Sequence, residues 1–528
     1  MNVRTRLARL GALVVVAALA SVGVAPAHAA DVYVTITGSG STWSQNALDQ
    51  WRTNVASNYG MTVNYNGTGS SAGRNDFINQ TVDFAVSEIP FQANPEDGSP
   101  PENPTTGYAY MPIVAGGTSL MYNLKIGGKR VTNLRLSGEV IAKIFSGQIS
   151  NWNDPAVQAD NPALTMPDRP ITPVYRSDGS GTSAQFTLWM SKQFPNIWTQ
   201  GMLSQFPQIN SSFKGQNGSL GVAGYVSQNY GEGAITYVEY SYAKTSGFPV
   251  AKVLNKAGYF VEPTYRSVAV ALMSATINPD LTQNLEGVYN SGDPRSYPMS
   301  SYSYMIVPTQ TNKIFTEAKG KTLSIFASYM ICEGQQSAKD LGYSPLPMNL
   351  VQAGSDVIAK IPGTAGAVDF NKCNNPTFKP GDSPTNNQLA QSAPNPDDCD
   401  KQGPTQCLGG TGGAQEETPA TGSGGVPGGS TDGAGAAGGD TAGGAAAAAA
   451  AGAAASGGEP VYDANGNLVS GSAIGTAAAA VSLPFTLAEG GWGTPQYIML
   501  AAGVLVVAAI LVPPLVSRRS RRGSDARG

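Results

Sequence analysis

Three short stretches rich in Gly, Ser and Thr contain the residue types best able to hold a ligand. They lie at residues 38–42 (GSGST), 67–71 (GTGSS) and 176–182 (RSDGSGT). Each stretch follows a strand-like run and opens a helix-like run, and a helix N-terminus offers free N–H groups and partial positive charge. Glycines let the backbone approach closely and hydroxyls add donors, so the pattern suits a dehydrated oxyanion. Arg176 would add one full counter-charge and a fork of donors.

Ordinary helix capping is the alternative for each of these loops, because Ser, Thr and Gly are common where helices begin. Capping explains any one such loop well. Three of them, one carrying Arg176, favour a shared anion site. Arg176 could instead form a purely structural ion pair with Asp178 or another acid.

Two other motifs overlap the second loop. Residues 69–73 (GSSAG) fit the G-x-S-x-G nucleophile elbow, and residues 67–72 fit a relaxed dinucleotide fingerprint, with Glu88 near the place of the ribose acid. The only histidine of the chain is His28, so Ser-His-Asp catalysis, Cys-His catalysis and histidine metal sites are excluded from the folded region. The fingerprint lacks its third glycine. We therefore expect no enzyme activity, no cofactor and no metal site.

The elements that must hold the loops alternate between strand and helix patterns. Residues 32–36 alternate in polarity as a strand does, and residues 43–55 repeat large apolar side chains at helical spacing. Residues 63–65 precede the second loop in the same way, and residues 186–190 give the third loop a helical apolar face. Strands alternating with helices predict an α/β fold.

Both ends of the chain carry targeting patterns. Residues 1–29 are typical of a secretory signal peptide, with a basic start, an apolar stretch at 10–24 and small residues around a cleavage point. Residues 497–516 form an uncharged stretch of bilayer length, followed by the basic tail 517–528. Basic residues favour the cytoplasmic side of a membrane. We therefore expect a single-pass protein of the cell membrane whose folded part is extracellular.

The composition separates a folded region from a tether. Residues 388–495 are rich in Gly, Ala, Ser and Thr, include seven consecutive alanines at 445–451, and have few large apolar side chains to drive collapse. They predict a disordered tether after a folded region at about 31–387. The formal net charge is −4; without the two terminal segments, 24 basic residues face 35 acidic ones, a net charge of about −11. This balance does not favour nucleic acid as a partner.

Four cysteines predict two disulfides outside the cell. They are Cys332, Cys373, Cys399 and Cys407. Three pairings exist, and we favour Cys332 with Cys373 and the short loop from Cys399 to Cys407. No two of them have Cys-x-x-Cys spacing, so zinc is a poor alternative.

At the three loops the sequence resembles the PstS family, the substrate-binding proteins of phosphate ABC importers. The matching stretches are GSGSTW, NGTGSSAG followed by TVDFAVSE, and YRSDGSGTS, with further support from GAITYVEYSYAK and LGYSPLP. The resemblance covers residues 32–361. It implies a two-lobed, periplasmic-binding-protein-like α/β fold with two hinge crossovers. Lobe I would comprise residues 31–115 and 300–387, and lobe II residues 116–299, with the ligand clamped between them.

The resemblance also implies a ligand, partners and site residues. The ligand is inorganic phosphate, and the partners are the permease subunits of a phosphate ABC transporter and, through them, its ATPase. A cell-surface interaction or sensing protein on the same scaffold is the alternative. The family's phosphate ligands map onto Thr42, Trp43, Ser70, Glu88, Arg176, Ser180, Gly181 and Thr182, and Asp178 would hold Arg176 in place.

Two of these positions depart from the family pattern. The family carboxylate is typically Asp and is Glu88 here, and Trp43 replaces the usual Phe. An ionised carboxylate accepts hydrogen bonds and donates none. Phosphate near neutral pH still carries a proton and sulfate does not, so Glu88 should accept from phosphate and repel sulfate. The alternative is that Glu88 only caps or pairs within its own lobe.

Overall fold

The computed structural model describes residues 33–96, 98–427, 461–462 and 468–470. Its centre is an eight-stranded sheet with the order β2-β1-β3-β15-β4-β10-β8-β9. The strands of this sheet are β1 (Ile36–Gly40), β2 (Val63–Asn66), β3 (Phe84–Ser87), β4 (Tyr108–Tyr122), β8 (Thr172–Arg176), β9 (Lys214–Gln216), β10 (Ala234–Glu239) and β15 (Ser300–Pro308).

Two parallel groups of strands are joined in this sheet by β15 and β4, which pair antiparallel with each other and with their outer neighbours β3 and β10. β1 runs parallel to β2 and β3, and β8 runs parallel to β9 and β10. Between the groups, β4 pairs antiparallel with β15 over residues 108–117 and with β10 over residues 118–122. The long strand β4 therefore belongs to both halves of the sheet.

Short strands and helices complete the fold, and the predicted α/β class is confirmed. The short strands are β5 (Lys125–Ile126), β6 (Lys129–Arg130), β7 (Arg135–Leu136), β11 (Lys252–Leu254), β12 (Phe260–Val261), β13 (Thr276–Ile277), β14 (Gln283–Asn284), β16 (Gln406–Cys407), β17 (Gly425–Val426), β18 (Val461–Tyr462) and β19 (Leu468–Ser470). The helices are α2 (Gln45–Tyr59), α3 (Ser70–Ile78), α4 (Gly138–Phe145), α5 (Pro155–Asp160), α6 (Gly181–Gln193), α7 (Gly218–Ser227), α8 (Tyr240–Ser246), α9 (Tyr265–Leu272), α10 (Glu286–Tyr289), α11 (Glu317–Ile331), α12 (Ala338–Leu341), α13 (Met348–Ile358), α14 (Gln388–Gln391) and the 3-10 turns η1 (Asn229–Gly231), η2 (Glu333–Ser337) and η3 (Asp398–Asp400).

Helix α2 forms where the apolar side chains recur. Leu48, Trp51 and Val55 are buried on one face of the helix, which places the first loop against the core. The helix ends at Gly60, whose φ of 64° is left-handed and costs glycine little. The polar loop before α2 is thus held by a buried hydrophobic face.

Helix α6 fixes the third loop in a similar way. Phe186, Trp189 and Met190 are buried along it, as the spacing predicts. At its start, the side chain of Ser180 accepts a hydrogen bond from a backbone N–H of the first turn at 3.2 Å. Capping and the predicted anion loop therefore occur at the same residues, so the two explanations do not exclude each other.

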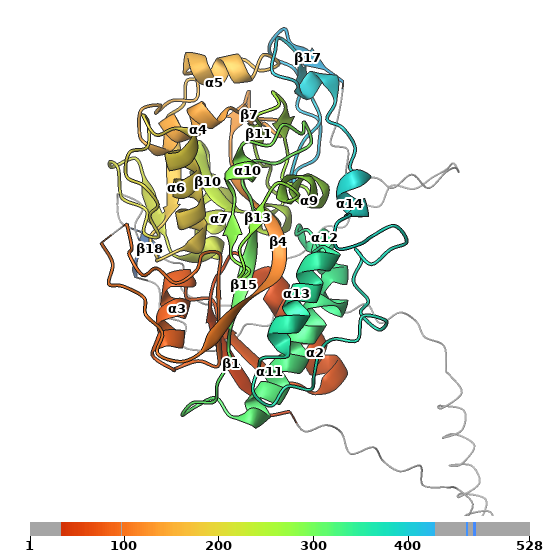
Figure 1. Cartoon of the computed structure of the whole chain (residues 1–528). Coiled ribbons are helices and arrows are strands. Elements are labelled where there is room, and N and C mark those ends of the chain that lie inside the picture. The colour runs from red at the N-terminus through yellow and green to blue at the C-terminus, as the bar shows by residue number, and fades with distance from the viewer. Residues whose placement is uncertain (1–32, 97, 428–460, 463–467, 471–528) are drawn as a thin grey trace, which may run out of the picture. The chain divides into compact units, whose positions relative to one another are not determined.

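Residues 388–427 differ from the tether expected over 388–495. They pack against the part of the fold that contains β7, β11 and α9, and we call them the C-terminal strap (cyan to blue in Figure 1). For example, Thr132 N donates to Thr418 Oγ1 at 2.7 Å. Because the strap is held by hydrogen bonds and one buried ion pair, with few large apolar side chains, its composition resembles that of a disordered segment.

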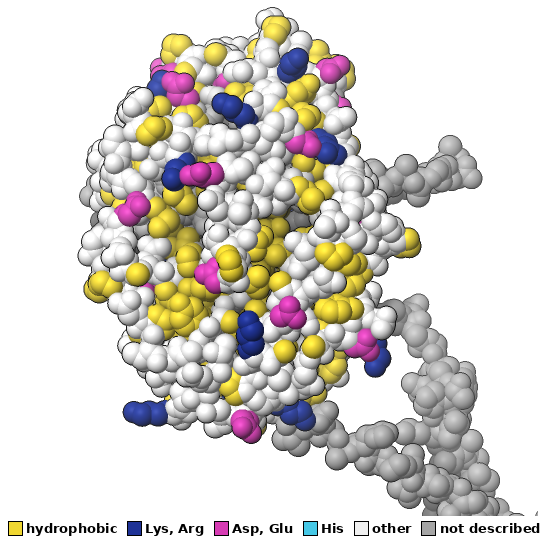
Figure 2. Space-filling view, in the orientation of Figure 1, with side chains coloured by type: hydrophobic (Ala, Val, Ile, Leu, Met, Phe, Trp, Pro, Cys, Tyr) yellow, Lys and Arg dark blue, Asp and Glu magenta, His cyan; other side chains and the backbone are white. Residues whose placement is uncertain are grey.

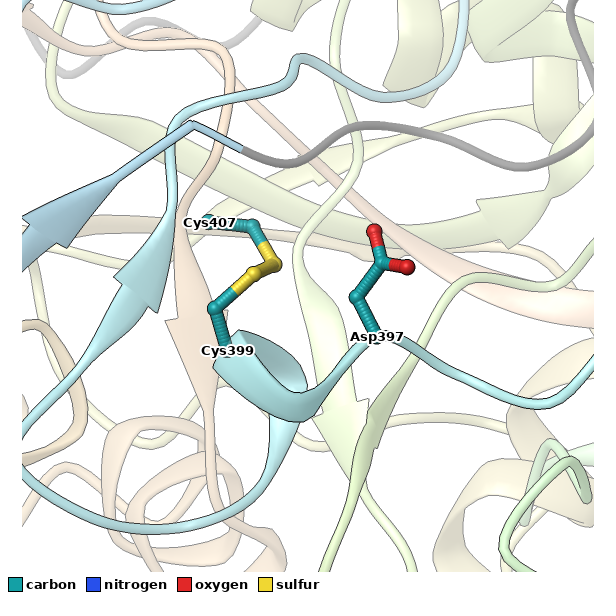
Figure 3. A group of neighbouring side chains, drawn as sticks. All are labelled: Asp397, Cys399 and Cys407. Atoms are coloured by element: carbon teal, nitrogen blue, oxygen red, sulfur yellow. A yellow bond between two sulfur atoms is a disulfide. The ribbon is translucent and has the colours of Figure 1, made fainter.

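Both favoured disulfides form. Cys332 at the end of α11 is bonded to Cys373, and Cys399 is bonded to Cys407 within the strap. Figure 3 shows Asp397 beside the second disulfide, and the three side chains are the only group of this kind close enough to suggest a metal site within the described ranges. A sulfur in a disulfide is not a thiolate ligand. We therefore assign this group to closing the strap's loop.

The predicted signal peptide (1–29), membrane span (497–516) and basic tail (517–528) lie outside the described residues, as does most of the predicted tether beyond residue 427. In the part of the chain that the structure covers, no helix is long and apolar enough to cross a membrane.

The strap's ion pair predicts a measurable loss of stability. Lys252 Nζ lies 2.6 Å from Asp400 Oδ2, and the two side chains are only 6% and 8% exposed. Burial raises the pKa of Asp400 although Lys252 opposes the rise. Lys252→Met leaves a carboxylate without its cation, so urea denaturation should show a loss of about 3 kcal/mol in the free energy of unfolding. The matched control is Lys192→Met, which breaks a pair with Glu286 that is 50% and 58% exposed and should cost less than about 1 kcal/mol. Equal losses in the two variants would contradict the prediction.

Candidate functional site

The candidate site lies where parallel strands end. The loops that follow β1, β2 and β8 open helices α2, α3 and α6, and β9 leads through Asn217 into α7. Glu88 directly follows β3. The carboxyl ends of parallel strands are the usual place for a ligand in α/β sheets. The sheet thus brings the three predicted loops and the predicted carboxylate to the same region.

The charges near this region are buried ones. Figure 2 shows charged side chains scattered over one face of the molecule without a large patch of a single sign. Arg176 and Glu88, in contrast, are almost fully buried. An anion entering this low-dielectric environment would meet one cation, Arg176, which is already paired with Asp178, and a second carboxylate, Glu88.

Arg176 is held by Asp178. Its Nε donates to Asp178 Oδ1 at 2.7 Å, and its Nη2 pairs with Oδ2 of the same carboxylate. Burial would raise the pKa of Asp178, but the hydrogen bonds and charge of Arg176 lower it below its ordinary value. Gly218 N, at the start of α7, also donates to Asp178 at 3.0 Å. The remaining Nη1 donates to Ser219 Oγ at 3.3 Å, so the guanidinium is oriented on both sides.

Glu88 is held by hydroxyl groups. Ser70 Oγ donates to Oε2 at 2.8 Å, Ser303 Oγ lies 3.1 Å from Oε1, and Ser41 Oγ donates to Oε1. Gly181 makes room for this carboxylate, because a Cβ at residue 181 would overlap Oε2. Glu88 therefore reaches the start of α6.

Several contacts join the first half of the site to the second. Ser219 N donates to Thr42 Oγ1 at 3.0 Å, and the two hydroxyl oxygens lie 2.9 Å apart. Ser71 N donates to Gly179 O at 3.1 Å. Gln185 Nε2 donates to the backbone oxygen of residue 88 at 2.9 Å. The segments 41–88 and 176–219 are thus in direct contact around the buried charges.

The other predicted residues take different places. Trp43 is fully buried, and its indole Nε1 donates to Thr118 Oγ1 at 3.3 Å, away from the carboxylate. A Cβ at Gly116 would lie 2.6 Å from the indole ring, so this glycine accommodates Trp in place of Phe. Ser180 caps α6, and Thr182 Oγ1 is buried without a hydrogen-bond partner among the described residues. Of these side chains, only the Thr182 hydroxyl neither donates nor accepts a hydrogen bond among the described residues.

Sequence reasoning missed three residues of the site. Ser41 lies in the first predicted loop, but nothing in the sequence indicates that its hydroxyl donates to Glu88. Ser219 opens α7 after a strand of only three residues, KGQ, which has no apolar alternation. Ser303 lies within the buried strand β15, where nothing in the sequence marks it as a site residue.

A buried acid beside the site predicts a pH-dependent stability. Glu239 ends β10, its Oε2 accepts from Ser241 N at 2.7 Å, and burial raises its pKa from 4.5 to about 8. Between these two values the native state binds a proton that the unfolded state has lost, so stability falls as the pH rises from about 4.5 to about 8.

Glu239→Gln should remove this pH dependence. Urea denaturation at pH 5 and pH 9 should show similar stabilities for the variant and the wild type at pH 5, and a more stable variant at pH 9. Parallel losses of stability in both proteins between these pH values would contradict the assignment.

The sequence of the chain is similar to those of known proteins. A family model described as a PBP superfamily domain matches residues 25–333. The phosphate-binding protein PstS of Pasteurella multocida is 32% identical over 324 residues, which are 60% of this chain and 88% of the relative. The phosphate-binding protein PstS 2 of Mycobacterium tuberculosis is 34% identical over 325 residues, 58% of this chain and 82% of the relative. A crystal structure of a phosphate-binding protein from Stenotrophomonas maltophilia is 18% identical, covers 64% of this chain and 96% of that one, and has a TM-score of 0.47. On the family model and the two PstS relatives, the chain belongs to the PstS family of phosphate-binding proteins.

Proposed function

We propose that this chain binds inorganic phosphate and delivers it to the permease of an ABC-type phosphate importer. One observation carries the proposal: a buried Arg176 and a buried Glu88 lie among hydroxyls at the starts of helices α2, α3, α6 and α7. The arginine supplies the counter-charge, and the carboxylate supplies an acceptor that suits an oxyanion still carrying a proton.

Each predicted ligand has a part in this proposal. Arg176 neutralises the anion, and Thr42 and Thr182 supply hydroxyl donors. The hydroxyl of Ser70 already donates to Glu88, so Ser70 would contribute its backbone N–H at the first residue of α3. Ser180, Gly181 and Trp43 contribute through the backbone of the helix starts, where N–H groups and partial positive charge favour an anion. Asp178 keeps the guanidinium in place.

The two predicted lobes give this site a mechanism of capture. Lobe I (31–115 and 300–387) and lobe II (116–299) would share the strands β4 and β15 as their hinge. Closure would bring Thr42 to Ser219, as in the contacts above. The C-terminal strap would be a third segment that passes from lobe I to lobe II, in addition to the two hinge strands. The Cys332–Cys373 disulfide holds the chain to lobe I, and the strap that follows in the sequence packs on lobe II.

Calorimetric titration of the full-length chain, purified in a mild detergent and stripped of anions, tests the function. We expect heat from tight phosphate binding and none from sulfate. A silent phosphate titration would overturn the proposal and favour the alternative of a cell-surface interaction or sensing protein on this scaffold. Hydrolysis of a chromogenic phosphate ester would contradict the proposal that the chain is a binding protein and no enzyme.

Glu88→Gln tests the selectivity of the site. The amide adds a donor where the carboxylate only accepts, so phosphate should bind at least about tenfold more weakly and sulfate should become a detectable ligand. The same titration measures both anions. Unchanged selectivity would support the alternative that Glu88 only caps or pairs within its lobe.

The ends of the chain complete the proposal. A signal peptide (1–29) would export the chain, and a membrane helix (497–516) with a cytoplasmic tail (517–528) would hold the binding domain outside the cell near its permease. Protease treatment of intact cells tests this arrangement. The binding domain should be digested and the tail protected.

A further inference from the structure

The hydroxyl groups around Glu88 leave it only one open position for a hydrogen bond. A carboxylate has about four acceptor positions, two on each oxygen. Ser41 and Ser303 take both positions on Oε1, and Ser70 takes one on Oε2. The single remaining acceptor position is therefore on Oε2.

The hydrogen of Ser303 decides whether Oε1 is fully occupied. Its hydroxyl oxygen lies 3.1 Å from both Glu88 Oε1 and Ser44 Oγ, and it has only one hydrogen to donate. A hydrogen bond to an ionised carboxylate is roughly twice as strong as one to a neutral hydroxyl. The hydrogen therefore goes to Glu88.

The open position faces the start of α6. A Cβ at Gly181 would overlap Oε2 and would lie 2.8 Å from Ser70 Oγ. Gly181 is the first residue of α6, and Thr182 follows it with its unpartnered hydroxyl. The open acceptor of Glu88 thus lies beside the donors of the helix start, where an anion would sit.

We propose that Ser303 is a positioning residue that makes the site selective for an oxyanion carrying a proton, an inference that rests on the proposed phosphate-binding function. Together with Ser41 it fixes Oε1, so that Glu88 presents one acceptor in one direction. A ligand with an O–H group pairs with that acceptor. A fully deprotonated oxyanion meets an unpaired lone pair in a buried site and is rejected.

Ser303 lies in a strand at the centre of the sheet. β15 pairs with β3, which precedes Glu88, and with β4, and its register shifts between Ser303 and Tyr304. The hydroxyl that orients the carboxylate therefore comes from the central antiparallel pair of the sheet, at an irregular point of that strand. Ligand selectivity is set by the middle of the sheet as well as by the loops.

The test is Ser303→Ala in the full-length chain, titrated with phosphate and with sulfate. We expect phosphate to bind about tenfold more weakly, and the preference for phosphate over sulfate to fall, because Oε1 loses a charge-assisted hydrogen bond. Ser301→Ala is the matched control. Ser301 is buried in the same strand, its hydroxyl has no partner among the described residues, and both affinities should stay at the wild-type level.

A double-mutant cycle separates positioning from general damage to the fold. In a Glu88→Gln background, Ser303→Ala should change neither affinity further, because the group it orients is no longer a carboxylate. Additive losses would overturn the proposal. Should Ser303→Ala lose its thermal unfolding transition, Ser41→Ala decides instead, since it removes the other hydroxyl from Oε1, and unchanged selectivity there overturns the proposal.

The outcomes also distinguish this inference from the function on which it rests. A wild-type chain that binds phosphate, with a folded Ser303→Ala variant of unchanged selectivity, overturns the role of Ser303 alone. A wild-type chain that does not bind phosphate overturns both.

Discussion

Arg176→Ala should weaken phosphate binding by roughly a hundredfold to a thousandfold, because truncating one partner of a buried charge pair costs several kcal/mol. The variant loses the counter-charge that the proposal assigns to Arg176 and also leaves Asp178 buried without its cation. Calorimetric titration of the full-length chain measures the affinity. Thermal unfolding of the anion-free protein measures how much of the loss is structural.

A second arginine in the chain provides the control. Arg295 makes the same two-pronged pair with Asp293, with its Nε 2.9 Å from Oδ1 and its Nη2 2.7 Å from Oδ2, but the pair is 22% and 32% exposed. Arg295→Ala should leave phosphate affinity unchanged. If Arg176→Ala retains wild-type affinity, Arg176 is a structural partner of Asp178 and the proposed site is wrong.

Gly181→Ala should also reduce phosphate affinity by about a hundredfold or more, with little effect on the stability of the anion-free chain. The new methyl would occupy the space of Glu88 Oε2 and approach Ser70 Oγ, so the carboxylate would have to leave its hydroxyl partners for the site to close. The backbone of Gly181 is already helical, so alanine causes no strain there. Titration with phosphate and urea denaturation without phosphate separate the two effects.

Gly224→Ala is the matched control for this substitution. Gly224 lies within α7, and a Cβ there would meet nothing within 4 Å. Alanine in place of glycine inside a helix should leave binding intact and raise stability by about 0.5–1 kcal/mol. A Gly181→Ala variant that binds phosphate like this control would show that Glu88 and α6 do not approach each other in the bound state.

The elements that could be predicted from the sequence are those in which a short local pattern, such as apolar residues at helical spacing, directly specifies the structure. Helix α2 follows from its apolar spacing. The loop before it is shorter than predicted, because Gly38 and Gly40 belong to the end of β1. The same reasoning, together with the family resemblance, identified Arg176, Asp178 and Glu88, and the structure brings these three residues into one region. Sequence reasoning could place these residues near one another because each pattern lies at the end of a strand, and their roles in binding stay predictions.

Residues that act across long separations in the sequence were not predictable. Ser303 contacts Glu88 from a strand more than 200 residues away, and the serine-rich run around it has no helical or loop signature. The sequence predicts a tether where the C-terminal strap lies, because the strap is held mainly by hydrogen bonds and hydrogen-bonded pairs produce no periodic sequence pattern. Its ion pair between Lys252 and Asp400 joins two residues whose pairing only the fold could show.

The strap determines where mechanical force would enter the protein. Tension on the chain beyond residue 427 would first pull on β17, which lies alongside β16, and then on the loop closed by Cys399 and Cys407. Such a pull would shear the contacts that hold the strap, which include the hydrogen bond from Thr132 to Thr418 and the ion pair between Lys252 and Asp400. If the proposed membrane helix anchors the chain, the strap's contacts are the first that a pull on the anchor must break.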